Sequence, residues 1–95
     1  MDKNSPSFKW DSNGISAFEK QFDTNNNFIG SYNQNSYVRF DSFGVYGIQG
    51  KLNFTPTKEQ DIYDNAKFGM TWSRFFMKNN TEDGGSVEIS SDQDF

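Results

Sequence analysis

One short segment occurs twice in this chain. Residues 8–18 read FKWDSNGISAF and residues 38–48 read VRFDSFGVYGI, so an offset of thirty superposes them. Both copies follow one pattern: an apolar residue, a basic residue, an aromatic residue, Asp-Ser-x-Gly, and then a β-branched residue. The two segments are either a true structural repeat or two separate uses of one common turn, and both readings predict the same local structure twice. This repeat therefore constrains the fold more tightly than composition does.

The Asp-Ser-x-Gly motif predicts a tight turn in each copy. An Asp that opens a turn accepts hydrogen bonds from the backbone amides that follow it, and a Gly that closes the turn can take a positive φ. We therefore predict that Asp11 and Gly14, and Asp41 and Gly44 in the second copy, are structural turn residues that close two β-hairpins.

The length of each turn decides which side chains share a face of the hairpin. A four-residue loop places four residues of each copy on one face: Phe8, Trp10, Ile15 and Ala17, and correspondingly Val38, Phe40, Val45 and Gly47. A three-residue loop with a bulge shifts the register by one residue and brings Phe18 or Ile48 to that face instead. The sequence fits both registers.

Composition favours strands over helices. The chain has eleven Phe, four Tyr and two Trp but a single Leu, and aromatic side chains pack well on pleated sheets. We predict a mainly β fold of hairpins and meander sheets with one short α-helix near 56–67, where Thr55 caps the helix and Pro56 is its first residue. Period-two alternation predicts one continuous, buried strand over 68–77, and a last strand follows at 86–90.

The chain is long enough for one domain with a modest core. We expect residues 1–6 to be a flexible N-terminal segment and residues 7–95 to form a single small β-rich domain. The sequence stops at Asp94-Phe95, which has the character of a strand that is beginning. We therefore expect the domain to be a fragment of a longer chain.

Charge and residue usage argue against several classes of function. The net charge of −4 and the absence of basic clusters argue against nucleic-acid binding, and no apolar run is long enough for membrane insertion. Histidine and cysteine are absent, and Asp23–Asn27 imitates a calcium loop without its glycine or its final glutamate. We expect no metal and no cofactor.

The acidic residues also have a structural explanation. Asp11, Asp23, Asp41 and Asp83 all fall in expected turns or loops, where Asp is favoured because it accepts backbone hydrogen bonds. A glycan hydrolase needs only two carboxylates across a cleft, and it is kept as a minor alternative. We predict a protein that is not an enzyme.

The aromatic residues support two hypotheses. In the first they pack: Phe8, Trp10, Phe40 and Trp72 are the predicted packing anchors, with the two tryptophans in the core. Hairpin faces too apolar for one small chain to bury would then be covered by a neighbouring subunit or by a flanking segment. In the second hypothesis exposed rings stack on sugars, and the possible glycan platform consists of Tyr32, Tyr37 and Tyr46.

Three stretches resemble a known group of proteins. WDSNGISA, YVRFDSFGVYGI and DNAKFGMTWSRFFMKN are similar to segments of tail-associated structural, fibre and baseplate proteins from phages and prophages of Gram-positive bacteria. The resemblance covers most of the chain. The hairpin motif is short, so the stretch DNAKFGMTWSRFFMKN indicates this group of proteins more specifically than the motif does. Such tail proteins are long, whereas this chain has 95 residues.

The resemblance implies a structural or host-adhesion module, located in the virion tail after synthesis in the bacterial cytoplasm. The implied partners are other tail or baseplate subunits or copies of the chain itself, with a trimer as one possibility, together with a host cell-surface glycan. A carbohydrate-binding module for cell-surface glycans is the alternative function. The resemblance carries over no catalytic residue.

Overall fold

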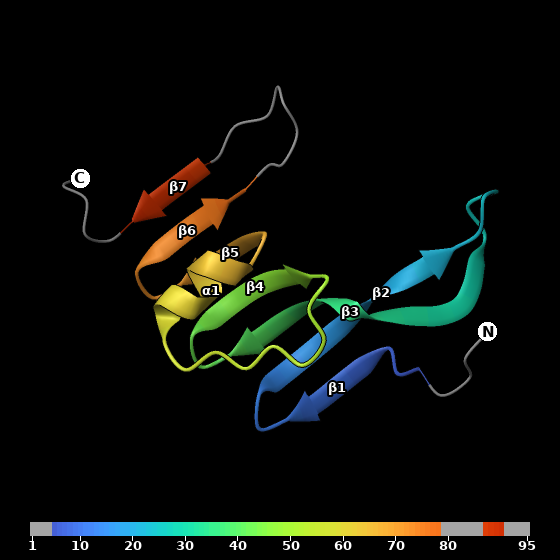
Figure 1. The fold of residues 1–95 in the computed structure, drawn as a ribbon, viewed down its shortest axis with the longest axis horizontal. Coiled ribbons are helices and arrows are strands. Elements are labelled where there is room, and N and C mark those ends of the chain that lie inside the picture. Colours follow the sequence, from blue (N-terminus) through green and yellow to red (C-terminus); the bar gives the residue numbers. More distant parts are fainter. Residues whose placement is uncertain (1–4, 79–86, 91–95) are drawn as a thin grey trace.

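A computed structural model describes residues 5–78 and 87–90, which form one antiparallel sheet whose strands follow sequence order (Figure 1). The seven strands found in these residues are β1 (Phe8–Asp11), β2 (Gly14–Phe22), β3 (Phe28–Asp41), β4 (Gly44–Gln49), β5 (Phe68–Thr71), β6 (Arg74–Met77) and β7 (Val87–Ser90). One short helix, α1 (Glu59–Asn65), lies between β4 and β5. The prediction of a mainly β fold with one short helix is confirmed.

Both Asp-Ser-x-Gly turns form as predicted. The Asn13 amide donates to the Asp11 carboxylate at 2.8 Å, and the Phe43 amide donates to the Asp41 carboxylate at 2.7 Å. The hydrogen bond from the Asn13 amide holds the pKa of Asp11 below its usual value. Each carboxylate thus satisfies a backbone donor that a tight turn leaves without a partner in the ladder.

The pairing within the hairpins matches the four-residue register. Trp10 lies opposite Ile15 in the first hairpin, and Phe40 lies opposite Val45 in the second. The alternative register with a bulge is wrong. Ile15 also pairs with Phe40, so the two hairpins are direct neighbours in the sheet.

A third hairpin follows at the same spacing. Trp72 and Ser73 connect β5 to β6, thirty residues after the equivalent turn of the second hairpin. The predicted continuous strand over 68–77 is therefore wrong. Because the turn resets the alternation, Phe76 pairs with Gly69 and lies on the face opposite to that of Phe68.

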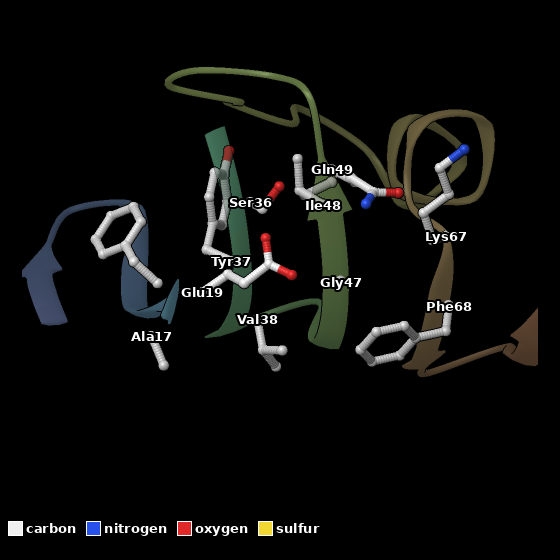
Figure 2. A pocket seen from close by; sticks show the side chains of 11 residues that line it. Ala17, Glu19, Ser36, Tyr37, Val38, Gly47, Ile48, Gln49, Lys67 and Phe68 are labelled. Carbon is white, nitrogen blue, oxygen red and sulfur yellow. The ribbon is translucent and has the colours of Figure 1, made fainter. Parts of the chain in front are cut away.

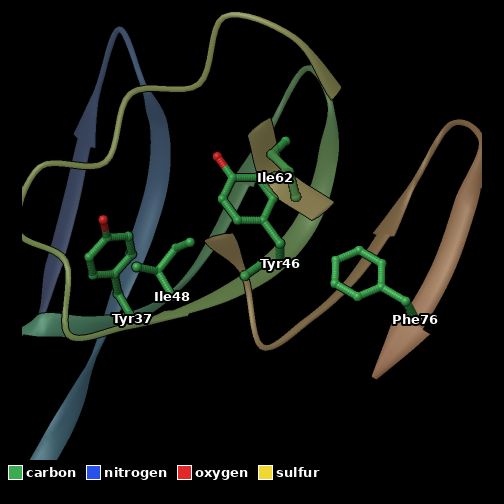
Figure 3. Close-up of a cluster of buried hydrophobic side chains, with 6 residues drawn as sticks. Tyr37, Tyr46, Ile48, Ile62 and Phe76 are labelled. Carbon is green, nitrogen blue, oxygen red and sulfur yellow. The ribbon is translucent and has the colours of Figure 1, made fainter. Parts of the chain in front are cut away.

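One face of the sheet is covered by the segment between β4 and β5, which includes α1 (Figure 1). The buried hydrophobic residues come from both layers: Tyr37, Tyr46, Ile48 and Phe76 from the strands, and Ile62 and Ala66 from the covering segment (Figure 3). Gly69 leaves room for this packing, because a Cβ there would lie 2.8 Å from the Phe76 ring. This two-layer contact is the hydrophobic core.

A buried arginine joins the two layers. Arg39 is only 5% exposed, and its Nε donates to Ser16 Oγ at 3.1 Å while a terminal nitrogen donates to the Phe54 carbonyl. The Tyr37 ring lies 5.0 Å from the guanidinium carbon, and its hydroxyl donates to the Lys51 carbonyl at 3.0 Å. Because these partners lie in both layers, they fix the covering segment in place.

The helix is shorter than predicted. It begins at Glu59, so Thr55 is not its cap and Pro56 lies outside it. The reason is local: the Thr57 amide and hydroxyl both donate to the Asp61 carboxylate, at 2.9 and 3.1 Å, and hold the chain in a turn before the helix. Because Asp61 lies in the first turn of the helix, these hydrogen bonds fix the helix start close to Glu59.

Glu59 attaches the helix to the third turn. Its carboxylate accepts hydrogen bonds from the Ser73 amide at 2.8 Å, the Ser73 hydroxyl at 2.6 Å and the Thr71 hydroxyl. Burial alone would raise the pKa of Glu59, but the hydrogen bonds from Ser73 and Thr71 outweigh it and lower the pKa. The charged form of Glu59 therefore stabilises the fold.

The far half of the β2–β3 hairpin forms an arm that projects beyond the other strands (Figure 1). Among the described residues, Glu19–Phe22 and Phe28–Asn33 pair only with each other, beyond a break in register after Phe18. Residues 1–4 of the expected flexible segment lie outside the described residues. Next to them, the Ser5 hydroxyl accepts a hydrogen bond from the Tyr32 amide of the arm at 3.1 Å.

We expect Gly44→Ala to destabilise the protein strongly. Gly44 has φ +144°, and an added Cβ would lie 2.1 Å from the Met70 carbonyl oxygen. Backbone strain and this clash together should cost about 2–4 kcal/mol. The control is Gly50→Ala, where φ is +80° but no atom lies within 4 Å, so only about 1 kcal/mol is expected. Urea unfolding of both variants measures the difference, and equal losses would contradict the proposed clash.

Stability should decrease as the pH falls through the acidic range. The pKa of Glu59 is lowered from 4.5 in the folded state, so its contribution is complete above that value and is lost as pH falls through the folded pKa. Glu59→Gln should lose about 1 kcal/mol at neutral pH, since the site is partly exposed. It should also show a shallower dependence of the unfolding free energy on acid pH. Glu19→Gln, on exposed β2 surface, is the control that should leave that dependence unchanged.

Candidate interaction surface

The face of the sheet opposite the core carries two rows of apolar residues, which we call the apolar face. Each row consists of residues that pair directly from strand to strand across β1 to β6. The row nearer the turns contains Trp10, Ile15, Phe40, Val45, Met70 and Phe75. The second row contains Phe8, Ala17, Val38, Gly47, Phe68 and Met77. None of these twelve side chains is charged or polar.

The repeat produces these rows. Each hairpin has apolar residues at the same positions before and after its turn, and the hairpins stand side by side in register, with Val45 opposite Met70. The closing glycines permit this approach: a Cβ at Gly14 would lie 2.3 Å from the Phe40 carbonyl oxygen, just as one at Gly44 would meet Met70. The turn glycines thus serve the packing of neighbouring hairpins as well as the turns.

The apolar face is exposed to solvent. Eight of its twelve residues are 39–82% exposed, whereas Ile15, Ala17 and Val45 are half-buried and Gly47 is buried. The residues between those of the rows point to the other face of the sheet. Figure 2 shows this difference: Tyr37 and Ile48 lie on the core side, whereas Val38 and Phe68 lie on the apolar face. Solvent-exposed apolar residues arranged in continuous rows are typical of interaction surfaces.

The structure places all four predicted packing anchors on the surface of the chain, so the expected core position of the two tryptophans is wrong. Phe8, Trp10 and Phe40 lie on the apolar face and are more than half exposed, so they do not pack within the chain. Trp72 lies in the third turn, where it is 81% exposed and its indole N–H donates to the Ser42 carbonyl at 2.7 Å. The tryptophans are outside the core because the single covering segment lies on the opposite face.

The predicted glycan platform does not form. Tyr37 and Tyr46 are buried, with 4% and 0% exposure, and Tyr32 is half-buried on the arm. Burial raises the pKa of Tyr46, and its hydrogen bond to the Asp41 carboxylate raises it further. Once the four-residue register is known, alternation from Gly44 places Tyr46 on the same face as Arg39 and opposite to Phe40, but the burial of that face depends on the covering segment.

A hollow of about 490 Å³ opens beside the second row, where β2 bends away from β3 (Figure 2). Its apolar walls include Ala17, Val38 and Phe68, and its polar lining is formed by Glu19, Ser36, Gln49 and Lys67.

Within residues 5–78 and 87–90, no three acidic side chains gather closely enough to hold a metal ion. In the same part of the chain, no helix has the length and apolar character of a membrane span.

Comparison with known proteins gives no relative. No protein family model, no curated protein and no solved structure matches the chain. The apolar face is therefore the main structural indication of function.

Trp72→Ala should cost about 1 kcal/mol or less, since an exposed side chain with one hydrogen bond contributes little to folding. Phe76→Ala should cost about 3–5 kcal/mol, because Phe76 is 2% exposed in the core. Denaturant unfolding of the two variants checks both values. A larger loss at Trp72 than at Phe76 would contradict the assignment of core and surface.

Proposed function

We propose that the chain is a non-enzymatic structural module of a phage or prophage tail protein, with a role in attachment to the host. Its partners are other tail or baseplate subunits or further copies of itself, and its site of action is the virion tail. The observation that carries the proposal is the apolar face, whose twelve uncharged positions extend across β1 to β6. The similarity of the hairpin segments to tail proteins adds the assignment to the tail.

Contact of the apolar face with water is unfavourable in free energy. Burial of apolar surface stabilises by about 25 cal/mol per Å², so any protein surface that fits the apolar face gains free energy by covering it. The uncharged rows offer no acid, base or nucleophile for chemistry. A module whose main surface feature is a flat apolar sheet is suited to assembly.

The arm supplies a second attachment element. Phe28 packs against Phe22 and Tyr32, with ring centroids 6.1 and 5.3 Å apart, yet Phe22 and Phe28 remain 55% and 42% exposed. A two-stranded ribbon without further support is only marginally stable. Contact with a neighbouring subunit would stabilise the arm and bury its rings.

The proposal is tested in particles of the phage or induced prophage that encodes the chain. Mass spectrometry of purified tails should detect its peptides in stoichiometric amounts. Phe40→Lys, which places a charge on the apolar face, should reduce incorporation into tails at least tenfold, whereas Leu52→Lys outside that face should not. Absence of the chain from purified tails would contradict the proposal.

Carbohydrate binding is the second candidate, and one observation favours it. The exposed Trp72 ring stands beside a surface hollow lined also by Phe40, Met70, Asp41 and Thr71. An exposed ring beside polar oxygens is a common arrangement for stacking on sugars. The candidate therefore depends on Trp72 in place of the tyrosines.

A glycan array tests this second candidate. Binding should be lost in Trp72→Ala and retained in Trp10→Ala, which removes a ring of similar exposure on another part of the surface. An array without a signal for the unmodified chain would eliminate it.

A further inference from the structure

We infer that the apolar face packs against the same face of a second copy of this chain. Two sheets would then lie face to face, and the covering segments with α1 would form the two outer layers. The inference names a partner for the surface described above, and it rests on the proposed structural role in that both require the face to be covered by protein.

The exposed area is the first argument. Eight larger side chains of the apolar face are 39–82% exposed: Phe8, Trp10, Val38, Phe40, Phe68, Met70, Phe75 and Met77. With roughly 150–250 Å² for a large side chain, they expose about 900 Å². The largest apolar patch of a typical monomer covers about 300–600 Å², whereas a stable interface needs about 800 Å² from each partner. The face therefore has the area of a complete dimer interface.

Charge is the second argument. None of the twelve residues is charged, so a partner cannot be selected by salt bridges across the rows and must itself be apolar and uncharged. The same face of a second copy meets this requirement without burying an unpaired charge. The nearby charges lie outside the rows: Arg39 is in the core, Lys9 pairs with Asp11 at 3.3 Å beside the first turn, and Glu19 and Lys67 line the hollow at the margin of the second row. The net charge of −4 also disfavours an anionic lipid surface as the occupant.

Shape is the third argument. Sheets pack face to face about 10 Å apart when both inner faces are apolar and without gaps. The Phe68 ring occupies the space above Gly47, where a Cβ would lie 2.1 Å from a ring atom. The second row is thus continuous although it contains a glycine. A twofold axis through the face would bring each row against its counterpart, as in an isologous dimer.

Light scattering on the purified chain tests the inference. We expect a mass twice that of the 10.9 kDa chain, decreasing to one chain on dilution. Phe40→Lys should raise the dissociation constant at least ~30-fold, because it places a charge in the centre of an apolar interface. Leu52→Lys is a matched control, since Leu52 and Phe40 are both 61% exposed and Leu52 lies in the covering segment. Circular dichroism should show that both variants keep the sheet.

Cysteine crosslinking locates the interface independently of the lysine variants. The chain has no cysteine, so single substitutions report on one position each. Val38→Cys, in the middle of the second row, should form a disulfide-linked dimer under mild oxidation. Leu52→Cys should crosslink at least tenfold more slowly at the same concentration.

Several results would overturn the inference. They are a single-chain mass at every concentration, a mass of three chains, or faster crosslinking at Leu52 than at Val38. Binding to phosphatidylcholine vesicles that is lost in Phe40→Lys would assign the face to lipid and would also overturn it. A chain that is monomeric alone but incorporated into tails through Phe40 would refute self-association and leave the proposed function intact. A dimer that is absent from tails would do the reverse.

Discussion

The structure depends on one constraint: within residues 5–78 and 87–90, a single segment covers the sheet. The residues between β4 and β5 lie over one face, and Arg39, Tyr37 and Glu59 fix them there through hydrogen bonds. Every hairpin must direct its core-forming side chains to that side. The opposite side then receives the remaining apolar residues of the repeat, which stay in contact with solvent.

Much of the fold could be predicted from the sequence, because its strongest signals are local. Asp11 and Asp41 accept hydrogen bonds from amides two residues away, so the turns depend on only a few neighbouring residues. The four-residue register follows once the turn is known. The third hairpin escaped prediction because its turn, Trp72-Ser73, lacks both the Asp and the Gly of the other two. Because these two turn residues are absent, the alternation of apolar and other residues over 68–77 indicates one continuous strand.

The identity of the exposed face could not be predicted, because it depends on where a distant segment folds back. Alternation divides Tyr46 from Phe40, but both are aromatic and nothing local states which side receives a cover. Their exposures, 0% and 61%, are decided by the position of the covering segment. For the same reason Tyr37 and Tyr46, which were expected on a platform, are core residues, and Trp10, which was expected in the core, lies on the apolar face.

The thirty-residue spacing divides the chain into a constant part and a variable part. Each hairpin uses about eleven residues, and the nineteen that follow form the arm after the first hairpin and the cover with α1 after the second. The pairing between neighbouring hairpins rests mainly on the constant part, which also contains the turn glycines. One more unit would therefore widen the sheet by two strands, or about 10 Å, whatever its linking residues do. In such a fold the number of hairpins in the sheet and the sequence of the connecting segments can change independently of each other.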